Sequence, residues 1–321
     1  MKKKEFVSDS GKKTFMALKL QAKLTGKDIH AVALRFALER FLGRVFAKEN
    51  ELLYNPMNET TLTEGQITVK GGMLMCIAED KNPLDSRATS DADLHIPGFK
   101  GSVDKFAEIV SEALKHDDST IDDGIRFHVD DISVAREKDG ENTGGTITIP
   151  LQIGDLFLKI KSDVTFDGRA MHLDAPTVEY ESVLPHSGLG KVTIRQTPWE
   201  YVLADKVCAM ASMGEKNYRI RDYNDVFVIL NNGLIDLEKA ADILKQNAEF
   251  KGLELPENVA DMGALSQAFI DRQAPRWEKE GTDKNFSAPA SLHDTISVIR
   301  EKLNPILEKI AGIENTQTQR L

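Results

Sequence analysis

Apolar residues recur at helical spacing from Phe15 to about Phe46, and this periodicity predicts helix rather than strand. Gly26 and Asp28 interrupt the pattern and divide it into two helices, with Asp28 suited to the N-cap of the second. Residues 54–64 are polar and rich in turn-forming residues, so we expect a loop there.

From Gln66 onward the pattern changes to short alternating segments. Residues 67–69 predict a strand, Gly71 and Gly72 a turn, and Met73 to Ala78 a short helix. A short strand near 91–96, a helix near 103–114 and three alternating stretches at 125–134, 146–153 and 156–166 follow. In the last stretch the apolar residues share one face, whereas Asp163 lies on the polar face, because strand side chains alternate. The pattern predicts a half-buried sheet.

The C-terminal part of the chain is predicted to be helical. Residues 167–198 read as loop, and the helices that follow are expected near 199–213, 221–233 and 234–246. A polar stretch at 271–291 then precedes a terminal amphipathic helix, which Pro305 is expected either to kink or to end halfway. We therefore predict two domains, residues 1–197 and 198–321.

Charge and cysteine content restrict the function classes. The chain has 41 basic and 51 acidic residues, a net charge of −10, which argues against a protein that coats polyanions indiscriminately. Residues 1–30 are nevertheless basic, and such an arm either holds a phosphate backbone or is simply a solvated face. Cys76 and Cys208 are too few for a disulfide scaffold or a four-thiolate zinc site, and we expect buried free thiols. With no signal peptide or membrane segment evident, we expect a cytoplasmic protein that does not contact membranes.

The candidate chemistry centres on three aspartates. Asp91 and Asp93 would lie on the same face of a strand, where two like charges repel unless a divalent cation neutralises them. Asp163 adds a third carboxylate, and three convergent acids suit Mg²⁺ in a two-metal phosphoryl or nucleotidyl transfer site. Each motif alone is weak, since aspartate pairs are common in solvated loops and paired glycines mark turns.

Two charged segments in the C-terminal part have both a structural and a functional interpretation. Asp205 and Lys206 lie within an apolar helical pattern, and Arg219, Asp222 and Asp225 can share one helical face. These residues either form a lattice of salt bridges or provide charges for a triphosphate. The histidines are scattered without metal-ligand spacing, so zinc is not expected.

Taken in order, five segments resemble the AbiEii/AbiGii-type nucleotidyltransferase toxin family of the DNA polymerase β-like superfamily. They are V-K-G-G-M-L (69–74), R-A-T-S-D-A-D-L (87–94), I-K-S-D-V-T-F-D (160–167), E-Y-V-L-A-D-K (200–206) and N-Y-R-I-R-D-Y-N-D (217–225). The resemblance implies an α+β fold, a nucleotidyltransferase-type mixed β-sheet with flanking helices, followed by a C-terminal helical domain.

The resemblance also implies roles for individual residues. Three acids would bind two Mg²⁺ ions: Asp91, Asp93 and Asp163. The nucleotide would be bound by Lys70, Gly71, Gly72, Arg87, Lys206 and Arg219. Lys206 resembles the family's catalytic lysine, which Asp222 would orient. The chain departs from the family pattern at Asp205, where Glu is usual, at Arg221, where Lys is common, and at Gly72, where many superfamily members have Ser.

The implied reaction is Mg²⁺-dependent transfer of a nucleoside monophosphate from a nucleoside triphosphate (NTP) to an acceptor hydroxyl, with release of pyrophosphate. Within the family this points to a toxin of a toxin–antitoxin or phage-defence (abortive infection) system. Its partner would be a cognate antitoxin, and its acceptor RNA, with the 3′ end of tRNA as the expected target. Two alternatives remain: a nucleotidyltransferase that modifies a protein or a small molecule, and a catalytically inactive interaction module.

Overall fold

The computed structural model describes residues 8–52, 54–55, 60–61, 66–115, 122–136, 144–166 and 175–312. The chain divides into two compact units. The first contains the residues up to Cys76 together with Asn82–Thr197, and the second contains Ile77–Lys81 and the residues from Pro198 on. The first unit mixes helices and strands, whereas the described part of the second is helical. The predicted α+β class is confirmed.

Two helices open the first unit, α1 (Asp9–Thr25) and α2 (Ile29–Leu52). Gly26 ends α1 in the left-handed conformation, with φ of 66°, which glycine adopts without steric cost. Oδ1 of Asp28 accepts hydrogen bonds from the backbone N–H groups of His30 and Ala31, so it satisfies two amides at the start of α2. The predicted break between two helices is confirmed.

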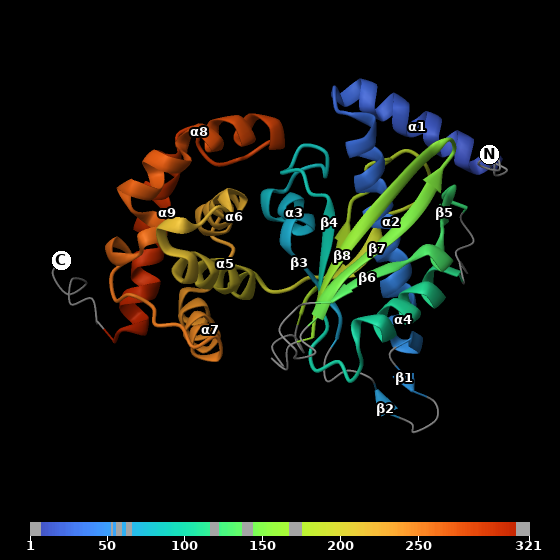
Figure 1. Ribbon diagram of the computed structural model, residues 1–321. Helices are drawn as coiled ribbons and strands as arrows, with labels where there is room; N and C mark the ends of the chain where they lie inside the picture. The colour runs from blue at the N-terminus through green and yellow to red at the C-terminus, as the bar shows by residue number, and fades with distance from the viewer. Residues whose placement is uncertain are drawn as a thin grey trace. The chain divides into compact units, whose positions relative to one another are not determined.

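The central sheet of the first unit has the strand order β3–β4–β8–β7–β5, and β6 also pairs with β7 (Figure 1). β4 and β8 are parallel, and the other strand pairs of this sheet are antiparallel. The strands are β3 (Thr68–Lys70), β4 (Asp91–His95), β5 (Ile125–Phe127), β6 (Ser133–Arg136), β7 (Gly144–Ile153) and β8 (Leu156–Thr165). Between β3 and β4 lie a 3₁₀ turn (Gly71–Leu74) and α3 (Met75–Glu79).

One face of this sheet is covered and the other is open. α2 and α4 (Val103–Lys115) pack against the covered face, where Ile149 of β7 and its register partner Ile160 of β8 are fully buried. On the opposite face β8 presents the exposed residues Phe157, Lys159, Lys161 and Asp163. The predicted half-buried sheet is confirmed, and Asp163 lies on its open face.

Three segments of the first unit differ from the predictions. In residues 54–64, expected to be a loop, β1 (Tyr54–Asn55) pairs with β2 (Thr60–Thr61), and the other positions up to 64 lie outside the described residues. The 125–134 stretch is split, because a 3₁₀ turn at Val129–Asp131 separates β5 from β6. The predicted loop at 167–198 contains the antiparallel pair β9 (Thr177–Tyr180) and β10 (Val192–Arg195), while 167–174 lie outside the described part. Strands of two to four residues are too short to show a recognisable alternation of apolar and polar residues.

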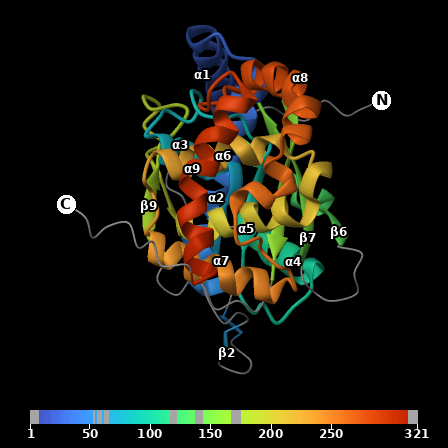
Figure 2. The ribbon, with the colours of Figure 1, turned by 90° about the vertical axis from the view of Figure 1, so that its left-hand side faces the viewer.

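The second unit is a set of helices around one hydrophobic core (Figure 2). Tyr223 and Phe269 stack within this core, with ring centroids 4.7 Å apart, and Trp277 is buried in the same core. α9 packs against α6, α7 and α8. The helices are α5 (Trp199–Met213), α6 (Ile220–Asn231), α7 (Leu237–Phe250), α8 (Gln267–Lys284) and α9 (Leu292–Ile310), with 3₁₀ turns at Gly214–Lys216, Val259–Asp261 and Gly263–Leu265.

The polar stretch at 271–291, for which no separate element was predicted, lies mostly in α8. α8 is polar except for a narrow stripe that includes Phe269 and Trp277, and the stripe is interrupted by Gln273. Gln273 is buried because its side-chain amide donates to the carbonyl of Asn217, so a polar residue occupies a core position.

The terminal helix α9 continues through Pro305 to Ile310, so the proline does not end it. Cys76 and Cys208 are buried free thiols, as predicted. Within the described residues, none of the helices combines the length and apolar character needed to span a membrane.

Candidate active site

The three predicted acids lie on neighbouring strands of the first unit. Asp91 and Asp93 alternate along β4 with the buried Ala92 and Leu94, so both carboxylates lie on the open face. The parallel pairing of β4 with β8 places Asp93 in register with Asp163. Neighbouring strands are separated by about 4.8 Å, so these two backbone positions are adjacent on the open face. The fold thus brings together acids that are far apart in sequence.

Threonine hydroxyls contact two of these carboxylates. Thr146 of β7 is the register partner of Asp163 and donates to its Oδ1 over 2.5 Å. Thr89, which precedes β4, donates to Oδ1 of Asp91 over 2.7 Å. Each hydroxyl fixes one oxygen of a carboxylate and leaves the other for a further ligand. Neither threonine stands out in the sequence, and the contact of Thr146 with Asp163 depends on the register of β7 with β8.

The chemistry of this donor set fits the predicted Mg²⁺. All three side chains offer carboxylate oxygens, the hard ligands that Mg²⁺ prefers. Across the described ranges, no group of three or more His, Cys, Asp or Glu side chains has the geometry of a formed metal site. Magnesium binding by Asp91, Asp93 and Asp163 therefore stays a prediction.

The turn at Gly71 and Gly72 passes very close to the acids. Gly71 has φ of 74°, and a Cβ atom added there would lie 1.8 Å from Oδ2 of Asp93. A Cβ on Gly72 would lie 2.6 Å from Oγ1 of Thr89 and 2.7 Å from Nη2 of Arg87. Larger residues at either position would displace the side chains around the acids, so the close approach requires glycine.

Two cations accompany the turn. Lys70 is the register partner of Asp93 on the antiparallel pair β3–β4, and its Nζ donates to Oγ1 of Thr165 over 3.2 Å. Arg87 is buried, and its Nη1 donates to the carbonyl of Ala88 over 3.2 Å. Lys70, Asp93 and Asp163 therefore lie in one row across β3, β4 and β8.

The remaining candidates form an ion-pair cluster in the second unit. Nζ of Lys206 on α5 lies 2.6 Å from Oδ1 of Asp222 and 2.8 Å from Oδ2 of Asp225, both on α6. Nε of Arg219 lies 2.9 Å from Oδ2 of Asp222. Lys206 and the two aspartates are almost completely buried, whereas Arg219 is half exposed. The ammonium group of Lys206 therefore lies within ion-pair distance of two carboxylates, those of Asp222 and Asp225.

The local structure of α6 fixes the positions of these aspartates. Between them, Tyr223 packs inward and donates its hydroxyl to the carbonyl of Ala264, and burial raises the pKa of this phenol above its usual range. Oδ1 of Asn224 accepts the backbone N–H groups of Ser287 and Ala288. The hydrogen bonds of Tyr223 and Asn224, which lie between Asp222 and Asp225 in the sequence, therefore fix this turn of α6.

The structure distributes the predicted residues over both units. In the first unit it brings together Lys70, Gly71, Gly72, Arg87, Asp91, Asp93 and Asp163. In the second unit it brings together Lys206, Arg219 and Asp222.

The fold and this arrangement agree with a comparison to known protein families. Residues 52–296 match the model of the nucleotidyl transferase AbiEii toxin family, of type IV toxin–antitoxin systems. The chain belongs to the AbiEii family. The predicted family and enzyme class are confirmed: the protein is a nucleotidyltransferase toxin of a type IV toxin–antitoxin system, and its family implies an NTP substrate and an antitoxin partner.

Two solved structures are similar to this chain at low sequence identity. The MenT4 nucleotidyltransferase toxin of Mycobacterium tuberculosis is similar with a TM-score of 0.51 and 13% identity, over 94% of this chain and 95% of that one. A protein structure from Helicobacter pylori has a TM-score of 0.43 and 13% identity, over 86% of this chain and 99% of that one. Among proteins with curated descriptions, none matches the sequence.

Asp205 and Arg221, which depart from the family pattern, do not join the Lys206 cluster through the ion pairs described. Oδ1 of Asp205 lies 2.9 Å from Nζ of Lys251 and accepts a hydrogen bond from Asn247. Nε of Arg221 lies 3.5 Å from Oε2 of Glu280. In this AbiEii protein Asp205 is therefore hydrogen-bonded to Asn247 of α7, and Arg221 pairs with Glu280 of α8.

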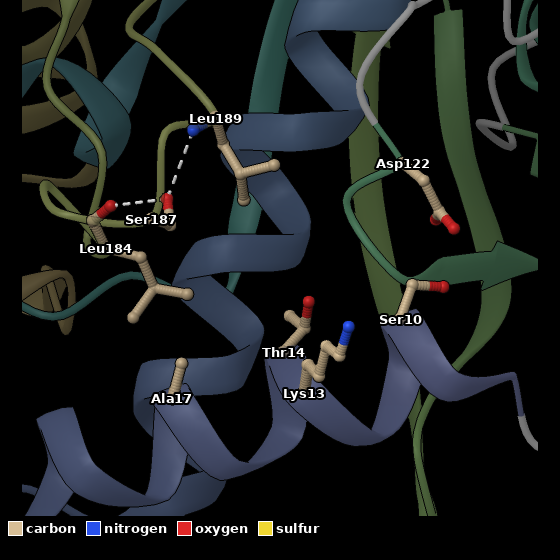
Figure 3. Close-up of a pocket in the computed structure, with 8 residues that line it drawn as sticks. All are labelled: Ser10, Lys13, Thr14, Ala17, Asp122, Leu184, Ser187 and Leu189. Atoms are coloured by element: carbon tan, nitrogen blue, oxygen red, sulfur yellow. Dashed lines mark hydrogen bonds between the residues drawn. The ribbon is translucent and has the colours of Figure 1, made fainter.

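A pocket of 510 Å³ in the first unit is separate from these candidates (Figure 3). Ser187 closes one side, donating to the carbonyl of Leu184 and accepting from the N–H of Leu189. The lining residues are Ser10, Lys13, Thr14, Ala17, Asp122, Leu184, Ser187 and Leu189. None of the predicted site residues is among them.

Proposed function

We propose that this AbiEii toxin is a Mg²⁺-dependent enzyme that transfers a nucleoside monophosphate from an NTP to the 3′-terminal hydroxyl of tRNA. The main observation that supports this proposal is the register pairing of Asp93 with Asp163 on the parallel strands β4 and β8. Asp93 and Asp163 lie side by side on these strands and Asp91 adds oxygen ligands on the same face, so the three carboxylates offer the hard donors that Mg²⁺ prefers.

The proposed reaction is an in-line displacement at the α-phosphorus of the NTP. The acceptor oxygen forms a bond to the α-phosphorus, the bond from that phosphorus to the bridging oxygen breaks, and pyrophosphate leaves. Asp163 orients the acceptor hydroxyl and takes up its proton, while Thr146 holds Oδ1 of the same carboxylate. Mg²⁺ held by Asp91, Asp93 and Asp163 would activate the attacking oxygen and stabilise the leaving pyrophosphate.

The remaining side chains bind and orient the nucleotide in this proposal. Lys206 and Arg219 bind the triphosphate through charge-assisted hydrogen bonds, and Asp222 keeps Lys206 oriented. Gly71 and Gly72 allow the backbone to approach the nucleotide phosphates next to Asp93, with Lys70 and Arg87 adding positive charge.

We also assign a cellular setting to this activity. As a toxin, the protein would act in the cytoplasm, where NTPs and tRNA are available, and would contribute to abortive infection when its antitoxin is lost. The type IV family supports the toxin–antitoxin assignment.

A labelling experiment tests the reaction. The full chain is incubated with each α-³²P-labelled NTP, Mg²⁺ and total RNA or cell lysate, and the products are resolved on denaturing gels. We expect label on tRNA, loss of labelling with EDTA, and recovery when Mg²⁺ is restored.

Substitutions in the same assay test the site. Asp91→Ala and Asp93→Ala are expected to abolish labelling and growth inhibition, whereas Asp130→Ala, at an exposed aspartate of the first unit, is expected to keep both. Label found only on protein would refute the RNA acceptor. Unchanged Mg²⁺-dependent transfer in both site variants would refute the assigned carboxylates.

A further inference from the structure

The open face of the sheet continues beyond the carboxylates along β8. Lys161, Lys159 and Phe157 follow Asp163 at alternate positions, so all of these side chains lie on the same face. All are exposed, and Phe157 leaves 63% of its surface accessible. We name Phe157, Lys159 and Lys161 the acceptor track.

The two lysines give this row a positive charge next to the proposed site. Lys161 is the register partner of Asp91 on the parallel β4–β8 pair. Lys159 and Lys161 are both exposed, so their ammonium groups are accessible to solvent. Exposed cations in a row suit a chain of phosphates.

Phe157 is an exposed aromatic ring supported from one side. The ring of His128 lies nearly parallel to it, with centroids 6.3 Å apart and an interplanar angle of 18°. The backbone N–H of His128 donates to the carbonyl of Pro150, which anchors this histidine to β7. An aromatic ring held in place with an accessible face can stack on a nucleobase of any type.

The far end of the row reaches the basic helix α1, which lies beside the β7–β8 turn (Figure 1). A Cβ atom on Gly154 of this turn would lie 2.9 Å from Cβ of Phe15, so α1 and the turn are in direct contact. Between Asp9 and Asp28 the chain carries five lysines and no other acid: Lys12, Lys13, Lys19, Lys23 and Lys27.

We propose that the acceptor track binds the single-stranded end of the nucleic acid that carries the acceptor hydroxyl, with a base stacked on Phe157 and phosphates on Lys159 and Lys161. Strand residues rise by about 3.4 Å each, so Phe157 lies about 20 Å from Asp163, a length spanned by several nucleotides. This inference rests on the proposed function, because it assumes that the acceptor is nucleic acid. It explains how a chain with a net charge of −10 binds a polyanion at one location.

Equilibrium binding tests the acceptor track directly. The probe is a fluorescein-labelled 12-nucleotide single-stranded RNA with a free 3′ hydroxyl, and its anisotropy is followed with the full-length protein at several KCl concentrations. We expect Phe157→Ala to weaken binding about tenfold, as loss of one stacked base does, and Phe157→Tyr to restore it. We expect the double variant Lys159→Ala/Lys161→Ala to flatten the dependence of log K on log salt by about 1.4.

Matched controls come from the second unit. Phe250 is exposed to a similar extent, 61%, and Lys245 and Lys279 are exposed lysines. Phe250→Ala and Lys245→Ala/Lys279→Ala are expected to bind the probe as the unmodified protein does. If the track and control variants bind equally well, or if a duplex RNA of the same length binds as tightly as the single strand, the acceptor track is wrong.

The labelling assay separates this outcome from failure of the proposed function. If tRNA is labelled but Phe157→Ala changes neither probe binding nor the KM for tRNA, the proposed function stands and the acceptor track is refuted. If only protein is labelled and the probe does not bind, both are refuted.

Discussion

Replacing Lys206 by methionine measures how much the buried ion-pair cluster contributes to folding. The substitution removes the ammonium group and keeps an unbranched side chain. Lys206 is 11% exposed, and its partners Asp222 and Asp225 are 8% and 0% exposed. In Lys206→Met these two carboxylates lose the cation that lies between them.

The size of the effect follows from burial. Removing one partner of a buried ion pair typically costs 3–5 kcal/mol, because the other charge remains buried without compensation. Asp222 keeps its ion pair with the half-exposed Arg219, whose Nε lies 2.9 Å from Oδ2, so part of its charge remains compensated. We therefore expect Lys206→Met to lower the free energy of unfolding by about 3 kcal/mol.

Lys251→Met is the matched control. Lys251 lies 2.9 Å from Asp205, but both side chains are 32% exposed. Pairs this exposed contribute about 0–1 kcal/mol, because solvent screens them. The same substitution at the two lysines thus separates a buried pair from an exposed one.

Urea unfolding followed by tryptophan fluorescence is the assay, because both tryptophans, Trp199 and Trp277, lie in the second unit. Adding Asp225→Asn to Lys206→Met is expected to restore part of the stability, since it removes a buried negative charge. If Lys206→Met destabilises the protein no more than Lys251→Met does, the reasoning from buried charge is refuted.

Three further predictions concern the first unit. In urea unfolding, Gly71→Ala is expected to destabilise the fold by about 1–2 kcal/mol, since alanine disfavours positive φ. In the tRNA labelling assay it is expected to reduce nucleotide transfer about 100-fold, because the added Cβ displaces Asp93. Thr146→Val is expected to reduce transfer about tenfold by releasing Oδ1 of Asp163, with Thr146→Ser retaining activity, as steady-state labelling kinetics would show. Burial raises the pKa of Glu39, against the opposing effect of its neighbour Arg40, so the folded state holds this proton more tightly than the unfolded chain. The contribution of Glu39 to stability is therefore lost as the pH rises above about 4.5. In urea unfolding from pH 4.5 to 8, we expect the free energy of unfolding of Glu39→Gln to increase relative to that of the unmodified protein.

Each of these has a contrary outcome. Full activity of Gly71→Ala would show that Asp93 does not need its observed position. Equal activity of the valine and serine variants at Thr146 would show that the hydroxyl does not position Asp163. A stability difference between Glu39→Gln and the unmodified protein that does not change with pH would refute the inferred proton affinity of Glu39.

Features with local causes could be predicted from the sequence. Gly26 ends a helix because it adopts positive φ, and Asp28 begins the next because its carboxylate accepts nearby amides. The alternation along β8 likewise identified the open face that carries Asp163. In these cases the physical cause lies within a few residues of its effect.

Features that depend on distant partners could not be predicted. Gln273 occupies a core position in α8 only because the Asn217 carbonyl accepts its amide, and that acceptor cannot be identified from the sequence. Thr146 gains its role from the register of β7 with β8. Asp225 is close to Lys206 only because α5 packs against α6.

The parallel pairing of β4 with β8 has a consequence for synthesis of the toxin. Asp93 leaves the ribosome well before Asp163, and a parallel pair between such distant segments forms only after the intervening chain has closed into a loop. A nascent or prematurely terminated chain that lacks β8 therefore cannot assemble the proposed carboxylate site. On the proposed mechanism, translational errors upstream of β8 would therefore yield fragments without nucleotidyltransferase activity.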